Sequence, residues 1–151
     1  MGVRVKVRIG VGSRSIELPA LLNSGFESNE PDVVIPVRVA ETLGLWPPRG
    51  FRLEEVATAG GDVRIFVLPR QGRIRLLLGT NYEPEIACNI LINPYVDEVL
   101  LSDYVIDELG IVVLSFRRGL WRHKEDPAVS YTHLRAHETE ADLVCRLLLE
   151  K

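Results

Sequence analysis

Hydrophobic and polar residues alternate at the start of the chain. From Val3 to Ile9 the sequence reads VRVKVRI, so every second side chain is apolar, as in a strand with one buried face. The glycines of Gly10–Ser13 predict a turn, because glycine adopts positive φ without strain. The alternation resumes at Ser15 and passes into the apolar run Ala20–Leu22. The pattern predicts two strands joined by a turn.

Short apolar runs separated by glycine, proline and acidic residues continue to residue 116. Runs of this length, bounded by such residues, predict strands, and a glycine-rich tip at 59–62 predicts a hairpin. The further expected strands cover residues 33–35, 51–58, 63–68, 73–78, 85–92, 99–101 and 111–116.

Two short segments have helical signals. Pro36 suits a first helical turn, and Gly44 suits the position after the last turn. Ser102 is a good N-cap for a second helix, and Gly110 marks its end. Many short strands, these short helices and no long crossover predict an all-β fold, a closed barrel with one or two short helices. No internal repeat is expected, and no linker divides the barrel region into further domains.

Composition and charge narrow the function classes. The 151 residues suffice for one domain, and 46% hydrophobic and 26% charged residues are ordinary for a globular protein. A net charge of -3 gives no electrostatic case for nucleic acid, and the arginines alternate with apolar residues along strands. No apolar run approaches the roughly 18 residues of a membrane span. We expect a cytoplasmic protein that binds neither nucleic acid nor membrane.

The last 23 residues are predicted to have a different origin from the rest of the chain. The segment from 129 to 139, VSYTHLRAHET, resembles one translated frame of a sequencing-library adapter, and DLVCRLLLEK, from 142 to 151, resembles the remaining primer. The interpretation is a domain at 1–128 followed by adapter read-through at 129–151, from an environmental (metagenomic) read. An amphipathic helix is the alternative.

This interpretation removes His133, His137 and Cys145 from consideration. Cys88 and His123 then remain as the single cysteine and the single histidine. A Cys/His metal site needs more ligands than these, so the prediction is no metal and no cofactor.

Several motifs occur together in a recognisable order. ALLNSG at Ala20–Gly25, VVIP at Val33–Pro36 and AETLGL at Ala40–Leu45 resemble the active-site region of retropepsin-like aspartic peptidases, nearest to small archaeal members. ATAGG at Ala57–Gly61 is similar to their flap. VLLSD at residues 99–103, followed by a helix that ends in Leu-Gly-Ile, is similar to their second apolar motif and closing helix.

The resemblance implies an acid-protease barrel that works as a homodimer. In that family two aspartates, one from each subunit, share a proton and activate water. The corresponding motif here is Asn23-Ser24-Gly25, in which the serine braces the loop and the glycine permits its tight turn. The flap positions Ala59, Gly60 and Gly61, together with Asp103, would contact an extended peptide that pairs as an added strand.

Asn23 stands where the family has its catalytic aspartate. An amide keeps the shape and the hydrogen bonds of aspartate but does not titrate, so it acts neither as base nor as acid. Three explanations stay open: a natural non-hydrolytic homologue (a pseudoenzyme), a read error, and deamidation of Asn23 to aspartate. Among other carboxylates, Glu27, Asp32 and Asp103 are near the predicted groove in sequence. The alternative for Asp103 is a first-turn acid that suits the helix dipole.

Three functions follow as hypotheses. The first is a dimeric domain that binds extended peptide, or a partner's strand, without cleaving it. The second is an active aspartic endopeptidase, if position 23 is or becomes aspartate. The third is a structural barrel without a ligand.

Overall fold

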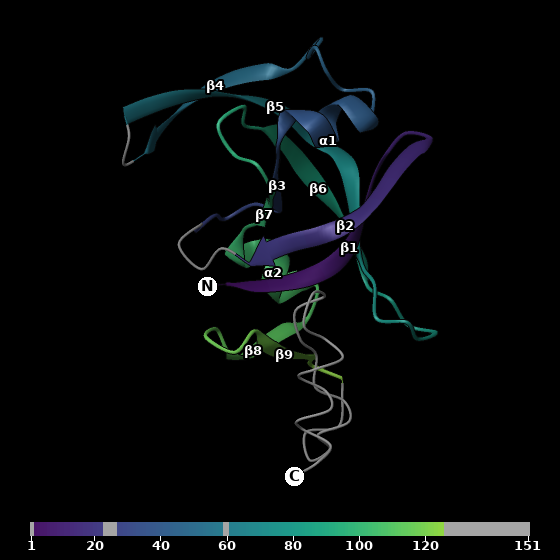
Figure 1. Ribbon diagram of the computed structural model, residues 1–151. Coiled ribbons are helices and arrows are strands. Elements are labelled where there is room, and N and C mark those ends of the chain that lie inside the picture. Colours follow the sequence, from purple (N-terminus) through teal and green to yellow (C-terminus); the bar gives the residue numbers. More distant parts are fainter. Residues whose placement is uncertain (1, 23–26, 59–60, 126–151) are drawn as a thin grey trace.

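The computed structural model describes residues 2–22, 27–58 and 61–125 (Figure 1). Within these ranges the chain is mostly β and closes into a barrel with short helices, so the predicted all-β barrel is confirmed. The elements are β1 (Val3–Val11), β2 (Arg14–Leu22), β3 (Asp32–Ile35), α1 (Val37–Thr42), β4 (Arg52–Thr58), β5 (Gly61–Leu76), β6 (Glu85–Ile92), β7 (Val99–Leu101), α2 (Asp103–Glu108), β8 (Ile111–Ser115) and β9 (Leu120–His123).

The barrel closes in the order β1-β2-β7-β3-β6-β5, with β5 pairing back onto β1. The β2–β7 and β3–β6 pairs are parallel, and the other pairs of the ring are antiparallel. β4 pairs with the first half of β5, and this hairpin extends away from the ring at the top of Figure 1. The ring positions the end of β2 beside β7.

β1 and β2 form the antiparallel pair that the alternation predicts. Val3, Val5, Val7 and Ile9 are buried inside the barrel, and the residues between them are less buried. The turn is tighter than expected: β1 continues to Val11, and two residues, at 12 and 13, connect the strands. A two-residue connection suits the twist of a hairpin, and Gly12 supplies a positive φ of 60°.

β5 corrects the expectation of separate strands at 63–68 and 73–78. It is one strand of 16 residues, and its register to β6 shifts between Leu68 and Gly72. Pro69 lacks an amide hydrogen and Arg70 has a positive φ of 57°, so the irregularity is a bulge. The bulge lets β5 pair with β4 before it and with β1 after it.

A β-strand followed by a short helix occurs twice in the described chain. β3 leads into α1, and β7 leads into α2. The strands of the two units lie antiparallel, with Val33 opposite Leu101. Each helix is followed by Leu-Gly, and Gly44 and Gly110 have positive φ values of 75° and 76°.

The apolar residues form two clusters. The main core fills the barrel and includes Val33, Ile35 and Leu101. The second cluster consists of Val34, Ile65, Val67 and Leu91, with Val63, Val96 and Leu100 packed at its margin. Because neighbours along a strand point to opposite faces, the second cluster lies on the outer face of the strands.

β8 and β9 form a separate two-stranded sheet near the bottom of Figure 1. β8 was predicted as 111–116, but β9 was not predicted. Trp121 and His123 on β9 are buried, whereas Leu114 and Phe116 are 48% and 46% exposed. The segment 129–151, with its predicted adapter origin, lies outside the described residues.

Candidate functional site

Most of the predicted site residues lie outside the described part of the chain. Gly61 and Asp103 lie within it. Those outside it are Asn23, Ser24, Gly25, Ala59 and Gly60.

Both flanks of segment 23–26 lie beside the start of α2. Before the segment, Leu22, the last residue of β2, pairs with Leu101, the last residue of β7. After the segment, the Ser28 amide donates a 2.9 Å hydrogen bond to Asp103 Oδ1. Asp103, one of the carboxylates near the predicted groove in sequence, thus lies beside Ser28.

Asp103 uses its carboxylate to hold backbone amides. Oδ1 accepts hydrogen bonds from the amides of Ser28 at 2.9 Å and Tyr104 at 2.8 Å. It is the acidic residue in the first turn of α2, whose N-cap Ser102 accepts from the Val105 amide. The first-turn interpretation is confirmed, since a negative charge at a helix N-terminus is stabilised by the exposed amides. Asp103 positions the chain that follows the motif.

A second polar network starts at Asp32 on β3. Asp32 Oδ2 accepts from the Ser28 hydroxyl, and Oδ1 accepts from Asn89 Nδ2, both at 2.8 Å. Asn89, on β6, is buried and accepts from the Arg70 amide at 2.8 Å. Hydrogen bonds thus connect the chain after the motif to the β5 bulge. Glu27, the third carboxylate considered, is exposed.

Sequence reasoning missed Ser28 and Asn89. Asn89 did leave a signal, because it is the one polar side chain in the apolar run at 87–92. A polar side chain within a buried strand needs hydrogen-bond partners, and here it has Asp32 and Arg70. Ser28 left none, since serine in a loop is common.

An apolar row crosses the outer face of the barrel toward the end of β2. Cross-strand neighbours place Leu21, Leu100, Val34, Leu91 and Val67 in succession on β2, β7, β3, β6 and β5. Val34, Leu91 and Val67 are buried, whereas Leu21 and Leu100 are half-buried. The accessible end of the row is therefore two residues before position 23.

The predicted flap corresponds to the β4–β5 hairpin. Gly61 opens β5 with a φ of 111°, a conformation that other residues rarely adopt, and its backbone lies opposite Thr58. The base of the hairpin contributes Val63, Ile65 and Val67 to the second apolar cluster. The hairpin is thus packed over the apolar row at its base.

Hollows of the described surface also lie away from this region, and two of them are large enough to note. One, of about 320 Å³, is lined by Trp46 and Phe51 in the loop after α1. The other, of about 160 Å³, lies beside the β1–β2 turn. Trp46 makes an edge-to-face contact with Phe66 at 5.9 Å between ring centroids.

Cys88 is a free, buried thiol on β6. Burial raises its pKa to about 12, the nearby Arg73 lowers it and Asp32 raises it. At neutral pH the thiol is protonated and therefore a poor nucleophile. Within the described ranges no group of three or more His, Cys, Asp or Glu residues is arranged to hold a metal ion.

Across the same described residues, no helix has the length and apolar character needed to cross a membrane. No protein-family model matches the chain, and no curated protein matches it significantly in sequence.

Proposed function

We propose that this chain is a retropepsin-like domain that binds an extended peptide, or a strand of a partner protein, without hydrolysing it. The observation that carries the proposal is the apolar row that ends at Leu21, on the strand that leads into Asn23. It offers apolar contacts beside the motif, while the amide at position 23 lacks the acid–base chemistry of an aspartate.

The half-buried margin of the second cluster supports a peptide ligand. Val63, Val96 and Leu100 are partly exposed around the buried centre formed by Val34 and Leu91. Side chains of an extended ligand alternate in direction, so every second one can reach such a margin. The ligand's backbone would pair with exposed strand edges, as in other cases of strand addition.

The proposal includes a homodimer. A single motif occurs in this chain, and Leu114 and Phe116 expose apolar surface on the small β8–β9 sheet. A two-stranded sheet is marginal by itself and gains stability when more strands join it. We expect sedimentation velocity to show a dimer at about 10 µM, a concentration that populates dimers of micromolar affinity.

The Leu114→Glu variant tests the dimer. It should sediment as a monomer, since the charge would be placed in an apolar interface. Leu53→Glu is the matched control, because both leucines are 48% exposed on strands. Dissociation by both variants, or by neither, contradicts an interface at β8.

The Asn23→Asp change tests the chemistry. The protein with Asn23 should bind fluorescent apolar peptides and leave them intact between acid and neutral pH. The aspartate variant should cleave them at acidic pH and be inhibited by hydroxyl-containing transition-state analogues. Asn29→Asp is the matched control: it adds the same charge at an exposed position six residues further on and should not cleave.

Mass spectrometry must accompany this assay to exclude deamidation of Asn23. Cleavage by the intact amide form would overturn the non-hydrolytic proposal. Binding without cleavage by the aspartate variant would leave a binding domain that lacks the rest of a peptidase site. Failure of every form to bind peptide would favour the structural barrel.

A further inference from the structure

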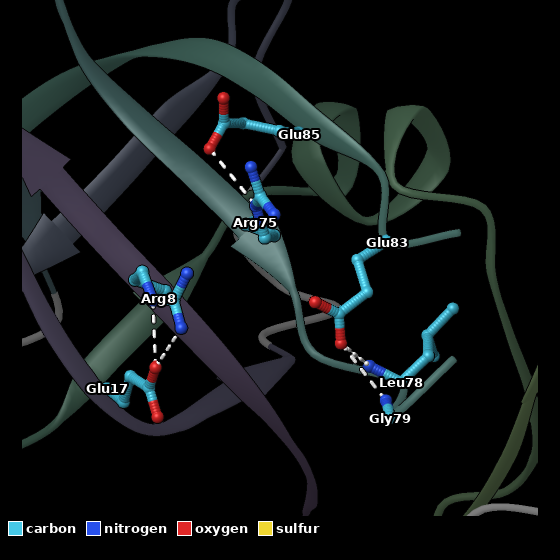
Figure 2. Close-up of polar contacts among 7 residues, drawn as sticks. All are labelled: Arg8, Glu17, Arg75, Leu78, Gly79, Glu83 and Glu85. Atoms are coloured by element: carbon cyan, nitrogen blue, oxygen red, sulfur yellow. Dashed lines mark hydrogen bonds and ion pairs between the residues drawn. The ribbon is translucent and has the colours of Figure 1, made fainter. Parts of the chain in front are cut away.

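The barrel seam where β1 meets β5 carries a row of four charged residues. Glu17, Arg8, Arg75 and Glu85 are successive cross-strand neighbours on β2, β1, β5 and β6. Arg8 Nε donates to Glu17 at 2.8 Å, and Arg75 Nε donates to Glu85 at 3.3 Å (Figure 2). The two arginines face each other, which is unfavourable for like charges, but each has a glutamate on its outer side. This row is therefore balanced in charge.

The next row toward the β1–β2 turn is not balanced. It places Ser15, Gly10 and Arg73 side by side on β2, β1 and β5. The Arg73 guanidinium lies over Gly10, since a Cβ added there would be 2.7 Å from Arg73 Nη2. Arg73 Nη2 donates to the Gly12 carbonyl at 3.0 Å. No carboxylate among the described residues forms an ion pair with Arg73.

A hollow of about 160 Å³ opens at this point. It is lined by Arg8, Gly10, Gly12, Ser13, Arg14, Ser15, Arg73 and Glu85. Glu85 is already bonded to Arg75, so its charge is compensated. The lining thus combines three arginines with two serine hydroxyls. Arg8 is paired with Glu17, whereas the hydrogen-bond acceptor of the Arg73 guanidinium is the neutral Gly12 carbonyl.

We propose that this hollow binds a small tetrahedral oxyanion, either inorganic phosphate or the phosphate group of a small phosphate monoester. The planar fork of arginine matches two oxygens of such an anion, and serine hydroxyls donate to a third. An anion would give Arg73 a charged acceptor in addition to the Gly12 carbonyl. The site lies at the opposite end of the β1–β2 pair from position 23 and is independent of the proposed peptide groove.

The site is tested by NMR titration of the full chain with phosphate at constant ionic strength, with chloride as the balancing anion. The side-chain Nε–H signal of Arg73 and the amides of Ser13 and Ser15 should shift saturably. The expected Kd is about 1–10 mM, because the arginines are partly exposed and screened by solvent. Shifts that grow linearly, or that chloride reproduces, overturn the proposal.

Two variants and a control assign the site. Arg73→Gln should raise the Kd about tenfold, the loss expected for a charge-assisted pair. Arg64→Gln is the control on the same strand; Arg64 is 71% exposed and pairs with Glu55, so the Kd should stay within about twofold. An equal loss in both variants would show non-specific attraction and overturn the site.

Gly10→Ala keeps every charge and adds a methyl group at a residue that lines the hollow. Its methyl group must displace the Arg73 guanidinium, which is a flexible end, so the fold should persist while the Kd rises severalfold. An unchanged Kd would exclude this hollow. Phosphate and O-phosphoserine distinguish the two sources: tighter binding of phosphoserine assigns a monoester, and equal binding assigns free phosphate, and both results support the site.

Discussion

The β3–α1 and β7–α2 units share one local pattern and are anchored in different ways. Each has an apolar strand, a short helix and a glycine of positive φ after the helix. In the second unit Ser102 caps the helix and Asp103 binds a loop amide. In the first unit Pro36 makes no side-chain cap, and the polar contacts are at the strand start, Asp32.

Ser28 is common to both anchors. Its amide donates to Asp103 of the second unit, and its hydroxyl donates to Asp32 of the first. The residues that follow the motif are therefore tied to the helix start of one unit and to the strand start of the other. Two units with the same β–α pattern can therefore differ in their polar residues, and here those residues hold the loop.

The anchor of the first unit should be the most sensitive. Asn89→Leu keeps the shape but leaves Asp32 Oδ1 and the Arg70 amide without their partner. We expect a loss of about 3 kcal/mol in the free energy of unfolding, because buried polar groups are left without hydrogen-bond partners. Urea denaturation measures it. The control is Asn93→Leu at the half-buried residue after β6, which loses only an exposed 2.9 Å hydrogen bond from the Tyr95 amide. Equal losses in the two variants would mean that the hydrogen bonds of Asn89 add no stability beyond that of the control position.

The two helix-ending glycines should differ. Alanine at either is strained by the positive φ, at a cost of about 1 kcal/mol. At Gly110 the added Cβ would also lie 2.6 Å from the ring of buried His123, whereas at Gly44 it would lie 3.3 Å from flexible Arg14 atoms. Gly110→Ala should therefore destabilise by about 2–3 kcal/mol and Gly44→Ala by about 1. Thermal unfolding, analysed with the same ΔCp for both variants, gives the two losses in the free energy of unfolding. A larger loss for Gly44→Ala than for Gly110→Ala would contradict the packing argument.

The two bonds of Ser28 can be separated. Ser28→Ala removes the bond to Asp32, and Asp103→Ala removes the acceptor of the Ser28 amide. Each should cost about 1 kcal/mol. Hydrogen exchange distinguishes them: the amide of residue 28 should exchange faster in Asp103→Ala than in Ser28→Ala. Equal exchange rates would show that Asp103 does not hold this loop.

Cys88 lies on β6, the strand that pairs with β3 of the first unit, and should make the stability of the protein slightly sensitive to alkaline pH. Its folded pKa of about 12 exceeds the ordinary value of 9.0, so between these values the unfolded chain releases a proton that the folded chain retains. This stability is complete below pH 9 and falls as the pH rises; by pH 9.5 the loss is about 0.8 kcal/mol. The free energy of unfolding is measured against pH for the Cys145→Ser protein, with and without Cys88→Ala. The loss of stability above pH 9 should occur only in the protein that keeps Cys88. Identical slopes would exclude Cys88 as its source.

Local patterns in the sequence determined most of the strands and both described helices. The alternation at 3–9, the apolar runs at 85–92 and 99–101, and the Ser102 and Gly110 signals all match observed elements. These signals are reliable because each depends on residues that are close in the chain. They are the alternation of side chains along a strand, the capping of helix ends and the residue preferences of turns. The position of Asp103 in a first helical turn followed from the same signals.

The continuity of β5 and the contacts of Asn89 and Arg73 depend on the tertiary structure, because the residues involved are far apart in the chain. The unbroken β5 depends on β4, β6 and β1 pairing with it on either side of Pro69, which sequence alone reads as a strand break. Asn89 meets Asp32 because β3 and β6 lie side by side, and Arg73 lies over Gly10 because the barrel closes there. Such contacts bring together residues from separate strands, and no local propensity encodes them.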